Sequence, residues 1–354
     1  MGMSGWSIYY KGDVLMSTND SCEIIKLDVS SLPMDEINNL YIADCLMTDK
    51  YGFLKRFRNE DEYKSAYLSN FNGNGNEIFS LGGNGKIHGI LTFMKGFDWS
   101  GKEQYKLIIK LTDVSASVSL MNCLRQFILE KLKLHMQIAI TMYGNELDEL
   151  LKGFSVKVQL KGNNYTLSKT DIDVSLLKET AEVLQAKNDD LHMVYTDVLP
   201  EEYIQQYCNL FNELQESMPD VAEDGFVQYV ESPEKLRGRI KSNAEHSRTH
   251  HCYMIFNANN EMVAQSNVAA NNNDPRFPYQ FLIGATKRYR GRNLGKWLYA
   301  LMYQKLFTEV DFVKAHVVHH PSNKHIIAIS EWVGYKFAFL ETTYVVELGQ
   351  VDAA

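Results

Sequence analysis

The pattern of apolar and polar positions predicts the same order of strands and helices twice along this chain of 354 residues. Alternation of the two predicts strands, and apolar residues spaced three and four apart predict helices. The elements of the first half are a strand at 23–29, a helix opening at Pro33, a hairpin at 76–96, a strand at 105–111, a helix from Leu120 to Leu132, a strand at 136–143, and a final pair of strands at 153–160 and 164–170.

The second half repeats this order. Its elements are a strand at 191–198, a helix opening at Pro200, a hairpin at 250–269, a strand at 278–286, a long helix from Leu294, a strand at 311–318, a short helix at 325–333 and a closing strand at 334–348. Asp28 and Asp197 lie 169 residues apart, and the halves end on similar segments, GFSVKVQLKGNNYTL and GYKFAFLETTYVVEL. The repeat predicts a duplicated α/β unit. The alternative is a chance likeness between two ordinary α/β domains.

The same pattern predicts where the domains begin and end. We expect an N-terminal extension at 1–21, a domain at 22–170, a polar and partly helical linker at 171–190, and a second domain at 191–354. The length fits this division, since domains average roughly 150 residues.

Composition narrows the class of protein. The net charge of −8 argues against a general nucleic-acid binder, which carries a basic footprint. Five scattered cysteines predict reduced thiols and a cytoplasmic location. Charged residues break up the first 20 positions, so we expect no signal peptide. The chain also lacks a run of 18 apolar residues, so we expect no membrane span.

One segment, 283–306, carries the chemistry that the sequence predicts. It places an apolar strand before a turn rich in arginine and glycine, and then an amphipathic helix. Gly291 and Gly295 allow a ligand to approach the backbone closely. Positive charge comes from Arg290, Arg292 and Lys296. Because the first turn of a helix also offers unpaired N–H groups, the segment predicts a cradle for an anion such as a pyrophosphate.

The turn resembles motif A of the GNAT acetyltransferases, Arg/Gln-x-x-Gly-x-Gly/Ala. The six positions are Arg290, Gly291, Arg292, Asn293, Leu294 and Gly295, so that Asn293 replaces the middle glycine. Asparagine tolerates left-handed backbone conformations better than most residues. Downstream, 323–335 resembles motif B, in which an asparagine opens a short helix ending in Gly-Phe/Tyr. Taken alone, YRGRNLG also fits a basic helix start.

The resemblance is strongest over 190–349 and weaker over 22–170. Where motif A belongs, the first half reads LTDVSASVSLMNCL, without a basic cluster and with Asp113 near the expected phosphate position. The whole chain resembles tandem GNAT proteins of the mycothiol-synthase-like architecture. That implies two α/β domains, each a mostly antiparallel twisted sheet flanked by helices. The first would be a degenerate copy that packs, shapes the acceptor cleft or dimerises.

In this family acetyl-CoA lies between two splayed strands, and an amine attacks its thioester directly. The resemblance places the splay between 279–285 and 312–318, with the N–H of Ala285 or a neighbour polarising the thioester carbonyl. The coenzyme site that it implies consists of Ile283, Gly284, Ala285, Arg290, Gly291, Arg292, Asn293, Leu294, Gly295, Lys296 and Asn323.

The family resemblance also points to residues that move protons. In many members a tyrosine eight residues into motif B protonates the leaving thiolate, and this position holds Ser330. Water, Tyr335 and Tyr344 are the alternatives. Candidate bases lie along or just past the strand at 311–318: His316, His319 and His320. We favour His319, and the alternative for each is a solvent-facing loop histidine.

Other clusters have simpler interpretations. Glu223 and Asp224 are expected to bind a cationic substrate amine, with a solvated acidic loop as the alternative. His246, His250 and His251 lack a recognised ligand spacing, so we expect no metal. GGNGK at 82–86 fits a hairpin turn better than a phosphate loop.

Together these features predict an acetyl-CoA-dependent N-acetyltransferase, an acyltransferase of EC 2.3.1 type, with acetyl-CoA as cosubstrate and a small-molecule primary amine as acceptor. We expect a cytoplasmic monomer or homodimer that binds neither nucleic acid nor membrane. Because Ser330 occupies the position of the acid tyrosine, a second hypothesis is a non-catalytic acyl-CoA-binding regulatory protein. A third hypothesis is a purely structural or interaction domain, which would not bind CoA.

Overall fold

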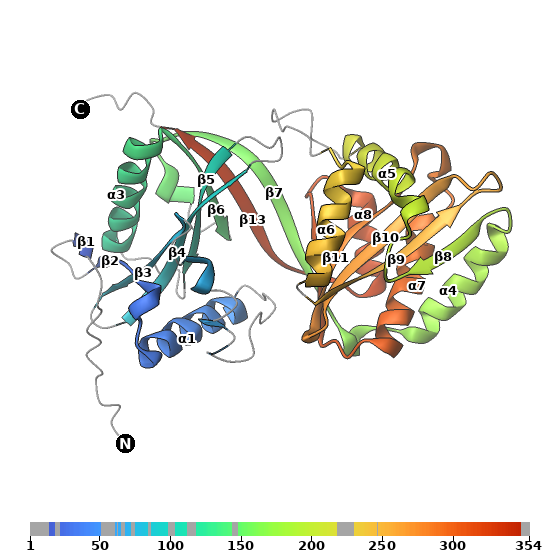
Figure 1. Ribbon diagram of the computed structural model, residues 1–354, viewed down its shortest axis with the longest axis horizontal. Helices are drawn as coiled ribbons and strands as arrows, with labels where there is room; N and C mark the ends of the chain where they lie inside the picture. The colour runs from blue at the N-terminus through green and yellow to red at the C-terminus, as the bar shows by residue number, and fades with distance from the viewer. Residues whose placement is uncertain are drawn as a thin grey trace, which may run out of the picture. The chain divides into compact units, whose positions relative to one another are not determined.

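The structure is a computed structural model, and it describes residues 14–17, 22–50, 61, 63–64, 68–71, 75–83, 86–97, 103–111, 118–143, 148–217, 230–245 and 247–347. The chain divides into two compact units (Figure 1). The first comprises Met1–Lys161 and Phe339–Ala354, and the second comprises Gly162–Ala338. None of the helices in the described ranges is long and apolar enough to cross a membrane.

The first unit is a mixed sheet in the strand order β1-β2-β3-β4-β5-β6-β13. Its strands are β1 (Val14–Ser17), β2 (Glu23–Lys26), β3 (Glu77–Gly83), β4 (Lys86–Phe97), β5 (Glu103–Leu111), β6 (Gln137–Tyr143) and the second part of β13 (Lys336–Glu347). Helix α1 (Met34–Lys50) buries Ile37 and Leu40 against one face. Helix α3 (Val118–His135) buries Leu124 and Phe127 against the other, and it forms the crossover between the parallel strands β5 and β6.

The second unit repeats this plan with more helices. Its sheet has the order β7-β12-β11-β10-β9-β8. The strands are β7 (Ser155–Ser168), β8 (His192–Thr196), β9 (Arg248–Phe256), β10 (Met262–Asn271), β11 (Asp274–Ala285) and β12 (Lys314–His319). The helices are α4 (Val174–Lys187), α5 (Ile204–Glu216), α6 (Pro233–Glu245), α7 (Leu294–Glu309) and α8 (Lys324–Val333). Strands β11 and β12 are parallel, with α7 as their crossover, and the other described pairs of this sheet are antiparallel.

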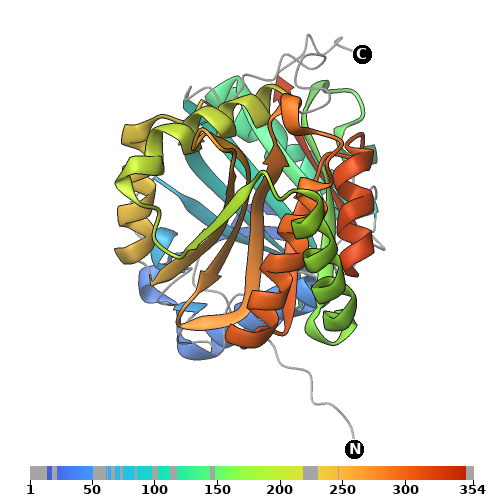
Figure 2. The same ribbon diagram turned by 90° about the vertical axis from the view of Figure 1, so that its right-hand side faces the viewer.

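Helices cover both faces of the second sheet (Figures 1 and 2). Alternate strand residues point to opposite faces, so Met254 packs beneath α5 and α6 while its neighbour Ile255 packs against α7. The core on the α7 face is the larger, because α7 buries Trp297, Leu298 and Tyr299 in one turn. This packing fixes the start of α7 beside the end of β11.

Three parts of the chain differ from the sequence prediction. Residues 339–354, predicted in the second domain, belong to the first unit. Segments 153–160 and 164–170, predicted as a pair of strands, form the single strand β7, and the division between the units falls within it. The polar residues around Gly162 continue the strand because Asn163–Ser168 pairs with β12. Residues 171–190, predicted as a polar and partly helical linker, are part of the second unit, because their helix α4 buries Leu177 and Leu184 in its core.

Candidate functional site

Strands β11 and β12 separate after a short paired stretch. Their register contains Tyr279 with His316 and Gln280 with Val317, and the described residues show no further pairing between these two strands. Just past this point Phe281 forms a bulge in β11, since Gln280 and Leu282 oppose adjacent residues of β10. The end of β11 stays paired with β10, so an opening forms between Phe281–Ala285 and the end of β12.

Main-chain groups of β11 face this opening. The N–H of Thr286 donates to the carbonyl of Val263 on β10, at 2.9 Å. Because N–H groups alternate sides along a strand, those of Ala285 and Ile283 point away from β10, toward the opening. At Gly284 a side chain would point out of the sheet toward α5, and a Cβ there would come within 2.6 Å of the Leu214 side chain.

The start of α7 presents a row of amides. The N–H of Trp297 donates to the carbonyl of Asn293, at 3.0 Å. Between Arg290 and Trp297, the six N–H groups of residues 291–296 have no hydrogen-bond partner in the part of the chain that the structure describes. Gly291 (φ 83°) and Asn293 (φ 60°) are both left-handed. When residues in the loop before a helix are left-handed, successive N–H groups point to one side. This arrangement makes an anion-binding concavity.

The basic side chains around these amides do not all point the same way. Arg292 forms an ion pair with Asp190 and donates from Nε to Asn188 Oδ1 at 2.9 Å, so it ties the turn to the segment after α4. Arg290 is exposed, with its Nε 3.4 Å from the carbonyl oxygen of Ala285. Lys296 Nζ lies 4.2 Å from the centroid of the Trp332 ring on α8.

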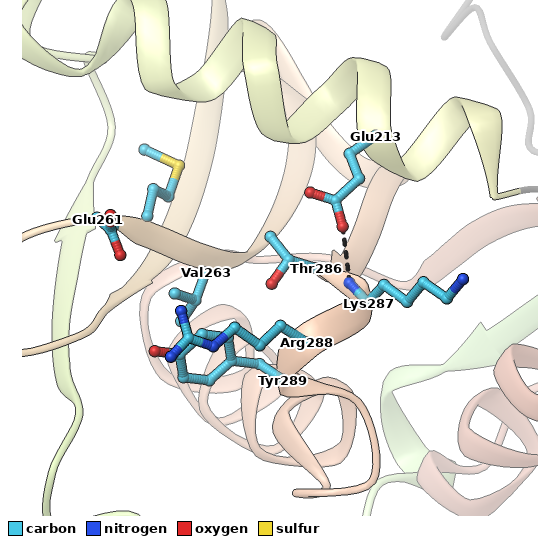
Figure 3. A pocket seen from close by; sticks show the side chains of 8 residues that line it. Glu213, Glu261, Val263, Thr286, Lys287, Arg288 and Tyr289 are labelled. Atoms are coloured by element: carbon cyan, nitrogen blue, oxygen red, sulfur yellow. Dashed lines mark hydrogen bonds between the residues drawn. The ribbon is translucent and has the colours of Figure 1, made fainter.

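A recess of about 570 Å³ lies beside the turn after β11 (Figure 3). It is lined by Glu213, Glu261, Met262, Val263, Thr286, Lys287, Arg288 and Tyr289. The Glu213 carboxylate accepts a hydrogen bond from the Lys287 N–H at 2.7 Å, which anchors the turn to α5. Arg288 lies over the ring of Tyr289, with Cζ 5.8 Å from its centroid.

His319 and Ser330 belong to one buried chain of hydrogen bonds. His319 Nε2 lies 2.7 Å from Ser330 Oγ, which lies 2.9 Å from the hydroxyl of Tyr299. All three side chains are buried, on the α7 face of the sheet. Burial lowers the pKa of His319 to about 4 and raises that of Tyr299 well above its ordinary value.

The lowered pKa of His319 predicts that the protein loses stability in acid. The folded state holds His319 neutral down to about pH 4, whereas an unfolded histidine protonates near pH 6.5. The unfolded chain therefore binds more protons between these values, and the contribution is complete above pH 6.5 and lost as the pH falls toward 4. We expect His319→Gln to reduce the drop in unfolding free energy between pH 7.5 and 4.5 by up to about 3 kcal/mol in urea titrations. An equal drop in both proteins would contradict this.

His316 lies at the head of the opening and on the opposite face from His319. Its Nε2 is 2.7 Å from Oδ1 of Asn164 on β7, and its ring centroid is 5.5 Å from that of Tyr279. Asn164 is fully buried, and its Nδ2 donates to the carbonyl of Gly162 at 3.3 Å. That bond orients the amide, so Oδ1 is the acceptor and His316 Nε2 carries the proton. In the neutral ring the lone pair then lies on Nδ1.

Other predicted residues take simpler places. Asn323 is the N-cap of α8 and is half-buried. Its main-chain carbonyl accepts a hydrogen bond from the Ile327 N–H. Glu223 and Asp224 lie outside the described residues, as does Asp113. His250 contacts Asn243 and His251 contacts Tyr195. The described residues contain no cluster of three or more His, Cys, Asp or Glu side chains suited to a metal ion.

The chain resembles solved structures in fold, while neither a protein-family model nor a curated protein matches it. A tandem GNAT protein from the clavulanic acid biosynthesis pathway is 13% identical, with a TM-score of 0.59 over 94% of this chain and 100% of that one. A GCN5-related N-acetyltransferase from Sphaerobacter thermophilus is 8% identical, with a TM-score of 0.59 over 92% and 95%.

A third is the GCN5-related glucosamine N-acetyltransferase region of a fungal multi-domain GH3 beta-N-acetylglucosaminidase. It is 10% identical, with a TM-score of 0.57, and the match covers 92% of this chain and 38% of that one. At these identities the likeness shows the fold. The chain therefore has the tandem GNAT fold, and the fold predicted from the repeated element order and the two motifs is confirmed.

Proposed function

We propose that the second unit binds acetyl-CoA and transfers its acetyl group to a primary amine of a small molecule. The observation that carries this proposal is the row of N–H groups at 291–296, placed beside the opening between β11 and β12. A pyrophosphate needs several donors in one concave surface, and a long thin ligand needs an open strand edge next to it. The tandem GNAT fold supports the same conclusion.

Each part of the coenzyme meets a different part of this site. The amides of 291–296 hold the pyrophosphate, with positive charge from Arg290 and Lys296. The N–H and C=O groups of Ile283 and Ala285 pair with the pantetheine arm, and the N–H of Ala285 or a neighbour polarises the thioester carbonyl. Arg292 acts as a positioning residue in this proposal, because its guanidinium already binds Asp190 and Asn188.

We place the general base at His316 in place of His319. His319 is buried on the α7 face, its Nε2 is bonded to Ser330, and its low pKa makes it a weak base. His316 lies at the head of the opening with Nε2–H held by Asn164, so that Nδ1 accepts the proton as the amine nitrogen forms its bond to the acetyl carbon. The C–S bond breaks, and solvent protonates the thiolate, since the Ser330 hydroxyl is fully buried.

Amine-dependent release of free CoA tests the proposal. We expect a thiol reagent to detect CoA only when acetyl-CoA and a suitable amine are both present. A panel of spermidine, an amino acid, an aminoglycoside and glucosamine samples the classes of small primary amine. Acetyl-CoA binding without turnover of any amine would instead support the non-catalytic acyl-CoA-binding alternative, which the burial of Ser330 favours.

A further inference from the structure

A second cavity lies in the second unit, between the sheet and the helices α5 and α6. It encloses about 130 Å³. Apolar walls come from Val198, Leu199, Tyr207, Leu236, Ile240, Ala244 and Cys252, and polar groups come from Asp197, Arg239, Asn243, Arg248, His250 and Asn267. None of these residues belongs to the coenzyme site proposed above, so the cavity is a separate feature.

An unpaired donor lies in the wall of this cavity. The Asn267 side chain is 2% exposed, and its Nδ2 has no hydrogen-bond partner in the described chain. Burying an unsatisfied donor is costly, and native proteins almost always supply a partner. Because Nδ2 can only donate, the partner that this site lacks is a hydrogen-bond acceptor.

Charge in the cavity favours an anionic acceptor. Arg239 is ion-paired with the buried carboxylate of Glu231 at 2.5 Å, whereas Arg248 makes no ion pair with any described residue. His250 is neutral: its Nε2 lies 2.8 Å from Asn243 Nδ2, and burial together with the two arginines lowers its pKa to about 4. Asp197 is exposed at the rim. Arg239 and Glu231 offset each other, which leaves Arg248 as the arginine of the lining without an ion pair among the described residues.

Size and lining limit the ligand further. A cavity of about 150 Å³ holds benzene, so this one holds a molecule of about six non-hydrogen atoms or fewer. Its apolar walls suit a short alkyl group. We infer that the cavity binds a small monocarboxylate, with the carboxylate accepting from Asn267 Nδ2 in the field of Arg248, and the alkyl group against Leu236 and Ile240.

Titration of the full, ¹⁵N-labelled chain with sodium propionate tests this inference independently of acetyl-CoA. At constant ionic strength we expect saturable shifts of the Asn267 and His250 side-chain signals with propionate, and none with sodium chloride or 1-propanol. Asn267→Leu and Arg248→Gln each weaken propionate binding by about tenfold or more, because each removes a donor to a charged acceptor.

The matched control is Arg237→Gln. This arginine lies on the same helix as Arg239 but is exposed, pairs with Glu201 and does not line the cavity. We expect it to bind propionate as the unaltered chain does. Arg248 is also exposed, so its variant is informative even where Asn267→Leu does not fold. The inference is overturned by equal responses to propionate and 1-propanol, by no saturable response, or by a crystal soaked in propionate that holds only ordered water in the cavity.

Discussion

Replacing His316 with glutamine is expected to lower the turnover number of acetyl transfer by about 10²- to 10⁴-fold, the range that a positioned general base contributes. The KM for acetyl-CoA should change little, because the His316 imidazole is bonded to Asn164, and the amides proposed to hold the coenzyme start at Gly291. Glutamine keeps a side chain able to hydrogen bond to Asn164 but cannot take up a proton at neutral pH.

The control for this variant is His320→Gln. His320 lies just past the end of β12 and hydrogen bonds to Ser322, and we expect its replacement to leave the turnover number within about twofold of the original. Steady-state kinetics with the best amine of the panel provide the measurement. A His316→Gln protein that keeps a third or more of the turnover would show that the base lies elsewhere.

Replacing Gly291 with aspartate is expected to weaken acetyl-CoA binding by at least about a hundredfold, while asparagine at the same position retains most of it. Gly291 is left-handed at φ 83°, a conformation that Asp and Asn tolerate better than other residues. A Cβ there would meet no atom within 4 Å, so both variants should fold. They differ by one charge, and a carboxylate about 4 Å from a phosphate is opposed by roughly 4 kcal/mol at an effective dielectric constant of 20.

Calorimetric titration with acetyl-CoA measures this difference. Thermal unfolding serves as the control, because we expect the two variants to melt within a few degrees of each other. Equal losses of affinity in both would mean that the backbone strain at position 291, and not the carboxylate charge, disturbs the site.

Local features of the sequence were enough to predict the fold and to mark the turn before α7 as a candidate anion-binding site. The turn YRGRNLG identified residues 290–295, and the structure gives Asn293 the left-handed conformation (φ 60°) that a glycine of the motif would readily adopt. The order of helices and strands could be predicted in the same way, because the spacing of apolar residues within each segment indicates whether it forms a helix or a strand. The linker at 171–190 and the paired strands at 153–170 were misplaced because Leu177 and Asn164 are fixed by distant partners.

The same limit explains which site contacts the sequence did not show. Arg292 was expected at the phosphates, yet it pairs with Asp190, 102 residues away, and His316 contacts Asn164, 152 residues away. No spacing rule joins positions so far apart. One signal was available, since asparagine is depleted in strands, and the Asn163–Asn164 pair inside an otherwise β-forming segment marks a position with a polar role.

We propose that this chain has one coenzyme site, formed by the start of α7 and the open edge of β11. The decisive experiment is calorimetric titration of the unaltered protein with acetyl-CoA. We expect one site per chain, lost in Gly291→Asp and kept in Gly291→Asn. The absence of binding, or a site that survives Gly291→Asp at full affinity, would contradict it.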